Sequence, residues 1–144
     1  MSPAEITAYL HANIPLTQAM GVEVESSDVD ALVLRAPLEP NHNHLGTAFG
    51  GSLSAIATLA AYGVVWLALG DGRAHVVVKD TSMRFRRPVR SDIRAVCRLP
   101  EEETMRIIRE EFSQKGRARL HLRAVIEDAG DPAVEFEGTF VATR

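Results

Sequence analysis

The chain has 144 residues, of which 46% are hydrophobic and 24% charged, and its formal net charge is -3. This length fits one domain, residues 1–144, and excludes two domains with separate cores. The apolar content excludes a disordered chain, and the balance of 16 basic and 19 acidic residues gives no general attraction to nucleic acid. Because no basic segment followed by an apolar one opens the chain, we expect no signal peptide and a cytoplasmic protein.

The first segment of the chain predicts a helix and two strands. Ser2-Pro3 is typical of a helix start and predicts a short helix over residues 4–12. Apolar and polar residues then alternate over residues 20–25 and 32–38, which predicts two half-buried strands. A loop over Glu39–Phe49 follows them.

The middle of the chain is an uncharged helical segment. No charged residue occurs from Leu45 to Gly70, and Leu53–Leu69 is almost wholly apolar, which approaches the length of a membrane span. The segment nevertheless opens with Gly50-Gly51, contains several hydroxyl residues and lies in a chain that otherwise alternates like a soluble sheet protein. We therefore expect no membrane partner and a helix buried on all sides, which ends at the turn Gly70-Asp71-Gly72.

The second half predicts more strands and one surface helix. Alternation indicates strands over residues 75–85, 91–99, 118–126 and 134–142, with a turn at Asp128–Pro132 between the last two. Glu101–Lys115 is the exception, because it begins with three glutamates and spaces its apolar residues at helical intervals. The single Cys97 falls on the apolar side of its strand, which predicts a buried structural thiol.

A helix that is apolar all round has to be wrapped, and an antiparallel sheet curled around it buries every face. This α+β architecture, a curved antiparallel sheet around a long central helix entered through a glycine-rich loop, resembles the hotdog fold of acyl-thioester enzymes. Many hotdog thioesterases carry Asn-x-x-Gly-x-x-His-Gly-Gly at the helix entry. Asn43 to Gly51 reproduce that spacing with Phe49 in the histidine position. The Phe-Gly-Gly variant and the helix before Lys115-Gly116-Arg117 resemble, more narrowly, a bacterial thioesterase domain found alone or fused to an acetyltransferase.

The loop residues support thioester chemistry. Gly50 and Gly51 let a ligand approach free amides at a helix N-terminus, where a thioester carbonyl oxygen gains negative charge; the alternative is that they serve only a tight turn. The resemblance implies that Asn43 orients the carbonyl or a water molecule, whereas asparagine also closes loops through its own hydrogen bonds. His44, two residues from His42 in the same loop, is the predicted general base, because histidine can serve as one near neutral pH. A solvated histidine pair is the alternative, and we expect no metal because no other ligand type lies nearby.

The chain departs from the resembling enzymes inside the helix. Hotdog thioesterases usually have an Asp or Glu two turns after the start of this helix. The matching residue here is Thr58, whose hydroxyl can hold a water molecule or donate a hydrogen bond to a helix carbonyl. Asp80 is the best replacement carboxylate, because it sits in an otherwise apolar strand. In hotdog dimers this strand borders the partner's helix, so Asp80 of one subunit would face Asn43 and Thr58 of the other. An ion pair with Lys79 of a neighbour or with an arginine is the alternative.

Six of the fourteen arginines fall between Arg84 and Arg98. Arginine binds phosphates bidentately, which suits the nucleotide diphosphate of coenzyme A. The alternative is that these arginines form a solvated face that balances the charge of the acidic helix Glu101–Lys115. The predicted substrate-binding residues are Phe49, Gly50, Ser82, Arg84, Arg86 and Arg87, and the predicted catalytic residues are Asn43, His44, Gly51, Thr58 and Asp80.

The function predicted from these residues is hydrolysis of an acyl thioester, with acyl-CoA as the substrate and water activated at a dimer interface. No cofactor is expected, since coenzyme A is part of the substrate, and the assembly is a homodimer or a dimer of dimers. A module that only binds acyl-CoA or an acyl-carrier protein is the first alternative. A dehydratase acting on a hydroxyacyl thioester, with His44 and Asp80 as acid and base, is the second.

Overall fold

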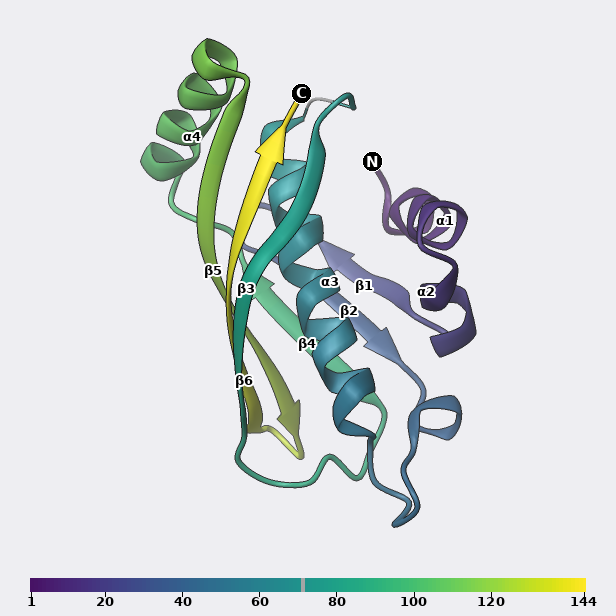
Figure 1. The fold of residues 1–144 in the computed structure, drawn as a ribbon. Coiled ribbons are helices and arrows are strands. Elements are labelled where there is room, and N and C mark those ends of the chain that lie inside the picture. The colour runs from purple at the N-terminus through teal and green to yellow at the C-terminus, as the bar shows by residue number, and fades with distance from the viewer. Residues whose placement is uncertain (71) are drawn as a thin grey trace.

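The computed structural model describes residues 1–70 and 72–144, which form one six-stranded antiparallel sheet with a long helix against its concave side (Figure 1). The helices are α1 (Pro3–Asn13), α2 (Pro15–Met20), α3 (Gly50–Leu69) and α4 (Glu102–Lys115), with a 3-10 turn η1 (Glu39–Asn41). The strands are β1 (Glu23–Ser27), β2 (Ala31–Ala36), β3 (His75–Phe85), β4 (Ile93–Arg98), β5 (Arg117–Asp128) and β6 (Asp131–Thr143). Their order in the sheet is β1-β2-β4-β5-β6-β3. The predicted α+β fold with a curved sheet and a central helix is confirmed.

Helix α3 has one stripe of residues that is only partly buried, which corrects the expectation that the helix would be covered all round. The sheet packs against residues such as Ile56, Ala60 and Val64, whose side chains are fully enclosed. Thr58 and Tyr62 are only partly buried, and Gly51 is exposed. The helix is long and apolar enough to cross a membrane, yet 56% of its most apolar window is buried, as in the core helix of a soluble protein. The six strands of the sheet curl part of the way around α3 and leave one stripe of the helix uncovered.

The N-terminal region contains two helices where one helix and a strand start were predicted. Pro15 opens the second helix, and Gly21, with φ 71°, ends it in the left-handed conformation. Met20 therefore lies in α2, and β1 begins only at Glu23. A six-residue helix is too short to show a helical period in the sequence.

The expected surface helix is found within one residue of its predicted start. It ends at Gly116, with φ 67°, and packs Met105, Ile108 and Phe112 into the core. From α4, the Arg109 side chain donates to the Ala68 carbonyl at 2.7 Å and so satisfies an orphan acceptor at the end of α3. Helix α4 thus holds the C-terminal end of α3, while the opposite end stays free. In the predicted turn after α3, Asp71 lies outside the described residues.

Cys97 is fully buried on the inner face of β4, as predicted. Burial alone raises the pKa of its thiol to about 12. The thiol therefore belongs to the core and stays protonated at neutral pH.

Candidate active site

The loop before α3 is held by hydrogen bonds of Asn43. Its side-chain amide donates to the Thr47 hydroxyl at 2.9 Å, and its side-chain oxygen accepts the amides of Leu45 and Thr47. All of these bonds stay within the loop, in the manner of the loop-closing alternative. Asn43 does not line the groove described below, and its role in orienting a substrate stays a prediction.

The N-terminus of α3 presents free backbone donors. Phe49 is the residue before the helix, its own amide donates to the Asn41 carbonyl at 2.7 Å, and no side chain caps the helix. Among the described residues, Leu53 is the first of the helix whose amide reaches a carbonyl, that of Phe49, at 3.1 Å. The amides of Gly50 and Gly51 are thus available to an acceptor, at the end of the helix where the dipole is positive.

The two glycines have different surroundings. A Cβ on Gly51 would overlap the ring of Phe49, whereas a Cβ on Gly50 would meet only the ring of Phe85 at 3.8 Å, an ordinary contact. Phe49, 56% exposed, therefore lies over Gly51. A side chain at position 51 would therefore displace the Phe49 ring, whereas at position 50 the space would admit a side chain.

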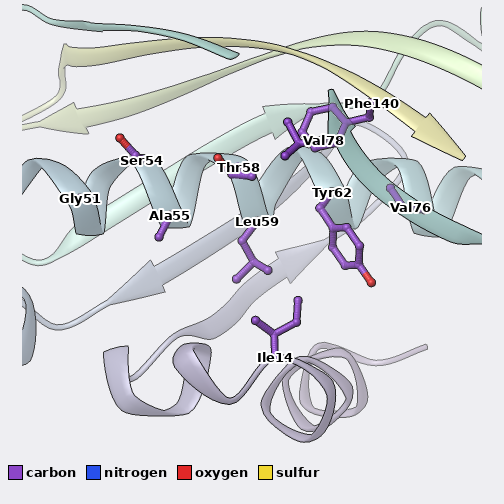
Figure 2. A pocket seen from close by; sticks show the side chains of 10 residues that line it. All are labelled: Ile14, Gly51, Ser54, Ala55, Thr58, Leu59, Tyr62, Val76, Val78 and Phe140. Carbon is purple, nitrogen blue, oxygen red and sulfur yellow. The ribbon is translucent and has the colours of Figure 1, made fainter. Parts of the chain in front are cut away.

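An apolar groove of about 510 Å³ runs along the open side of α3 and starts at Gly51 (Figure 2). Its walls are Gly51, Ser54, Ala55, Thr58, Leu59 and Tyr62 of α3, Ile14 from the α1–α2 junction, Val76 and Val78 of β3, and Phe140 of β6. The α3 residues recur at intervals of three and four, so they form one stripe along the helix. The stripe that the sheet leaves uncovered is therefore the wall of a cavity.

Two hydroxyl groups enter this groove close to Gly51. Those of Ser54 and Thr58 project from the same side of α3 (Figure 2). Among the described residues neither hydroxyl bonds back to a helix carbonyl, so both remain available to water or substrate. Thr58 was predicted for this place. Ser54 and Tyr62 were not, although their spacing from Gly51 would have placed them on the same helix face.

A bulge in β3 decides which of its side chains face the groove. The register with β6 shifts between Val78 and Asp80, so that Val78 lies opposite Phe140 and Asp80 opposite Thr139. Residues directly opposite one another project to the same face of a sheet, and Phe140 is part of the core. Asp80 consequently lies on the outer face, away from α3.

Ser82 and Arg84 share this outer face with Asp80. They lie opposite Glu137 and Glu135, and Ser82, Arg84 and these two glutamates line a small pocket of about 100 Å³. The structure thus brings Gly51 and Thr58 together within one chain and puts Asp80 on the far side of the sheet. The catalytic role of Asp80 stays a prediction.

The arginines at the end of β3 differ in their contacts. Arg86 forms an ion pair with Glu135 at 2.8 Å, and Arg87 with Asp131 at 3.4 Å. The acidic helix is not their partner, because its Glu103 and Glu110 pair with Arg106 of the same helix. Of the three predicted arginines Arg84, Arg86 and Arg87, Arg84 is the one for which the described residues form no ion pair.

The two loop histidines lie away from the groove. His42 and His44 are exposed, and a ring nitrogen of His42 lies 2.8 Å from the Asn43 carbonyl oxygen. Neither lines the cavity at Gly51. His44 and Asp80, the predicted acid and base of a dehydratase, both lie outside the lining of the groove, and their roles stay a prediction.

The sequence over residues 3–144 matches a family described as "Putative thioesterase (yiiD_Cterm)". The chain belongs to this putative thioesterase family. Membership confirms the predicted resemblance and places the chain among thioesterases in general.

Solved structures with similar chains agree with this assignment. A protein of unknown function from Chlorobaculum tepidum is 35% identical, with a TM-score of 0.93 over 99% of this chain and 97% of that one. A putative thioesterase from Shewanella oneidensis is 28% identical, with a TM-score of 0.87 and the same coverage. A probable thioesterase from Pseudomonas aeruginosa is 30% identical, with a TM-score of 0.82 over 98% of this chain and 95% of that one. These solved structures thus share the fold of this chain along nearly its whole length.

Proposed function

We propose that this chain hydrolyses acyl-CoA thioesters at the N-terminus of α3, in a site completed by a second copy of the chain. One observation carries the proposal: the free amides of Gly50 and Gly51 adjoin an apolar groove that also holds two hydroxyl groups. An acyl thioester offers a carbonyl oxygen to such amides and an alkyl chain to such a groove. Membership of the putative thioesterase family supports the same reaction.

Hydrolysis adds water to the thioester carbon and expels a thiol. As the water oxygen bonds to that carbon, the carbonyl oxygen takes up an electron pair, and the Gly51 amide and the positive end of α3 stabilise it. The carbon–sulfur bond then breaks, and the leaving thiolate takes the proton that the water loses. Ser54 and Thr58, about one and two turns into the helix, are placed to hold the water by hydrogen bonds.

A second copy is expected at the free edge of β3. The opposite edge strand, β1, is covered by α1, because the Thr7 hydroxyl accepts the Val24 amide at 2.9 Å. Among the described residues, strand β3 pairs only with β6, and its Val77 and Phe85 are 59% and 53% exposed. A long uncovered strand edge with exposed apolar side chains favours pairing with another strand. Such a dimer would also cover the open side of the groove and supply the base that one chain does not place there.

The assay follows thiol release from a panel of saturated acyl-CoA substrates. Thr58→Val keeps the shape of the side chain and removes its hydroxyl, so we expect kcat to fall by about tenfold or more. Thr104→Val, the same change on the exposed side of α4, is the matched control.

Asp80→Asn tests the predicted base. A loss of kcat as large as that of Thr58→Val supports a catalytic role for Asp80, and full activity excludes that role. If the wild type releases no thiol from any substrate, the proposal fails.

Arg84→Ala tests the coenzyme A part of the proposal. We expect KM to rise several-fold for acyl-CoA but not for an acyl thioester of N-acetylcysteamine, which lacks the nucleotide phosphates. An equal change for both substrates would exclude a phosphate contact.

A binding module is the second candidate, and one observation favours it. Among the described residues, no carboxylate, histidine or lysine lines the groove. Ligand-induced thermal stabilisation without thiol release would support binding alone.

A further inference from the structure

We propose that Tyr62 closes the far end of the acyl groove and limits the substrate to straight acyl chains of about ten to twelve carbons. This inference rests on the proposed function, because it takes Gly51 as the position of the thioester carbonyl.

The length follows from the helix that lines the groove. Tyr62 is the last α3 residue of the stripe that starts at Gly51, and their separation of eleven residues corresponds to about 16 Å of helix. An extended chain advances about 1.2 Å per bond, so this span holds about thirteen bonds. Because the Tyr62 ring projects from the last α3 residue of this lining and takes up part of the span, about ten to twelve carbons remain (Figure 2).

The lining beyond Thr58 selects an unsubstituted alkyl chain. Leu59 and Ile14 face one another across the groove, and Val76, Val78 and Phe140 form the other side (Figure 2). Among the described residues that line the groove, no polar side chain follows Ser54 and Thr58 until Tyr62. A polar or charged substituent in the middle of the acyl chain would have no hydrogen-bond partner there.

Contacts with α1 hold Tyr62 in place. The Tyr9 ring stacks on Trp66 with ring centroids 4.4 Å apart and planes 17° apart. Burial, and then the neighbouring Tyr9 side chain, raise the pKa of Tyr62 to about 12, so the hydroxyl stays neutral. Trp66, one turn further along α3, borders a second cavity of about 380 Å³. Removal of the Tyr62 ring would therefore open space in the direction in which a longer chain would extend.

The test measures kcat/KM for saturated acyl-CoA substrates of graded length with the wild type, Tyr62→Ala, Tyr62→Phe and Tyr62→Trp. Each methylene buried in the groove should raise kcat/KM by about fourfold until the end is reached. We expect the optimum to move about two to four carbons longer in Tyr62→Ala. It should stay in place in Tyr62→Phe, which keeps the ring, and become shorter in Tyr62→Trp. Ile107→Ala, at an exposed position on α4, should keep the wild-type profile.

Calorimetric titration with saturated free fatty acids of the same lengths separates this inference from the proposed function. A binding optimum that moves with the Tyr62 variants, without thiol release, would support the end stop and overturn the hydrolase. Hydrolysis with no length optimum, or with the same optimum in folded Tyr62→Ala and Tyr62→Trp, would overturn the end stop and leave the hydrolase standing. If Tyr62→Ala does not fold, Tyr62→Trp decides, and an unchanged optimum in it refutes the proposal.

Discussion

Gly51 stands where a side chain would meet both the Phe49 ring and the proposed carbonyl site. Because the Phe49 ring is largely exposed, it can move aside, and we expect Gly51→Ala to fold. The added methyl group and the displaced ring would obstruct the free amides, so kcat/KM should fall by about a hundredfold. Gly50→Ala, where the space is open, should cost much less. Steady-state kinetics of the two variants provide the comparison, and equal losses would contradict the assigned surroundings.

Cys97 gives a prediction about pH. Because the pKa of the Cys97 thiol is raised to about 12, roughly one thiol in ten thousand is ionised at pH 8. Burial also keeps reagents from reaching the thiol. We expect no reaction of the native protein with a disulfide reagent over minutes at pH 8, and one thiol per chain after unfolding in guanidinium. Rapid reaction of the native protein would show that β4 opens. Because the buried Cys97 thiol does not react with the reagent, it adds no background signal to the thiol-release assay.

At the scale of elements, β6 is the strand that sets the position of the groove wall. Gly138 lies between Phe136 and Phe140, and a Cβ there would approach the Phe136 ring to 2.7 Å. Both rings are buried in the core, so neither can move freely, and Gly138→Ala should lower the free energy of unfolding by about 1–3 kcal/mol. Gly72→Ala, with no atom within 4 Å of the added Cβ, is the control. Denaturant unfolding measures both, and similar stabilities would show that the strand adapts.

At the scale of the whole molecule, the unequal covering of the two sheet edges predicts a dimer. Val77→Lys puts a charge on the uncovered strand β3 and should shift the protein from dimer to monomer, because a charged edge opposes strand pairing. Val29→Lys, at a residue 87% exposed, is the matched control and should leave the assembly unchanged. Light scattering after size-exclusion chromatography gives the mass. If the wild type is a monomer that hydrolyses thioesters, completion of the site by a second copy is excluded.

Much of this molecule is determined by local sequence patterns. Alternation over β5 and β6, the helical spacing in α4 and the glycines that start α3 each depend on neighbouring residues, and the structure confirms them. The family motif likewise placed Gly51 and Thr58 together. Helix α2 was missed because six residues carry too little periodicity.

The tertiary structure alone decided two points that bear on catalysis. The bulge between Val78 and Asp80 arises from pairing with β6, and a one-residue shift turns the following side chains to the other face, so strict alternation could not place Asp80. The uncovered stripe of α3 follows from how far six strands reach around a helix. Composition gave α3 an apolar surface on all sides, but only packing against the sheet determined which side became core and which became the groove.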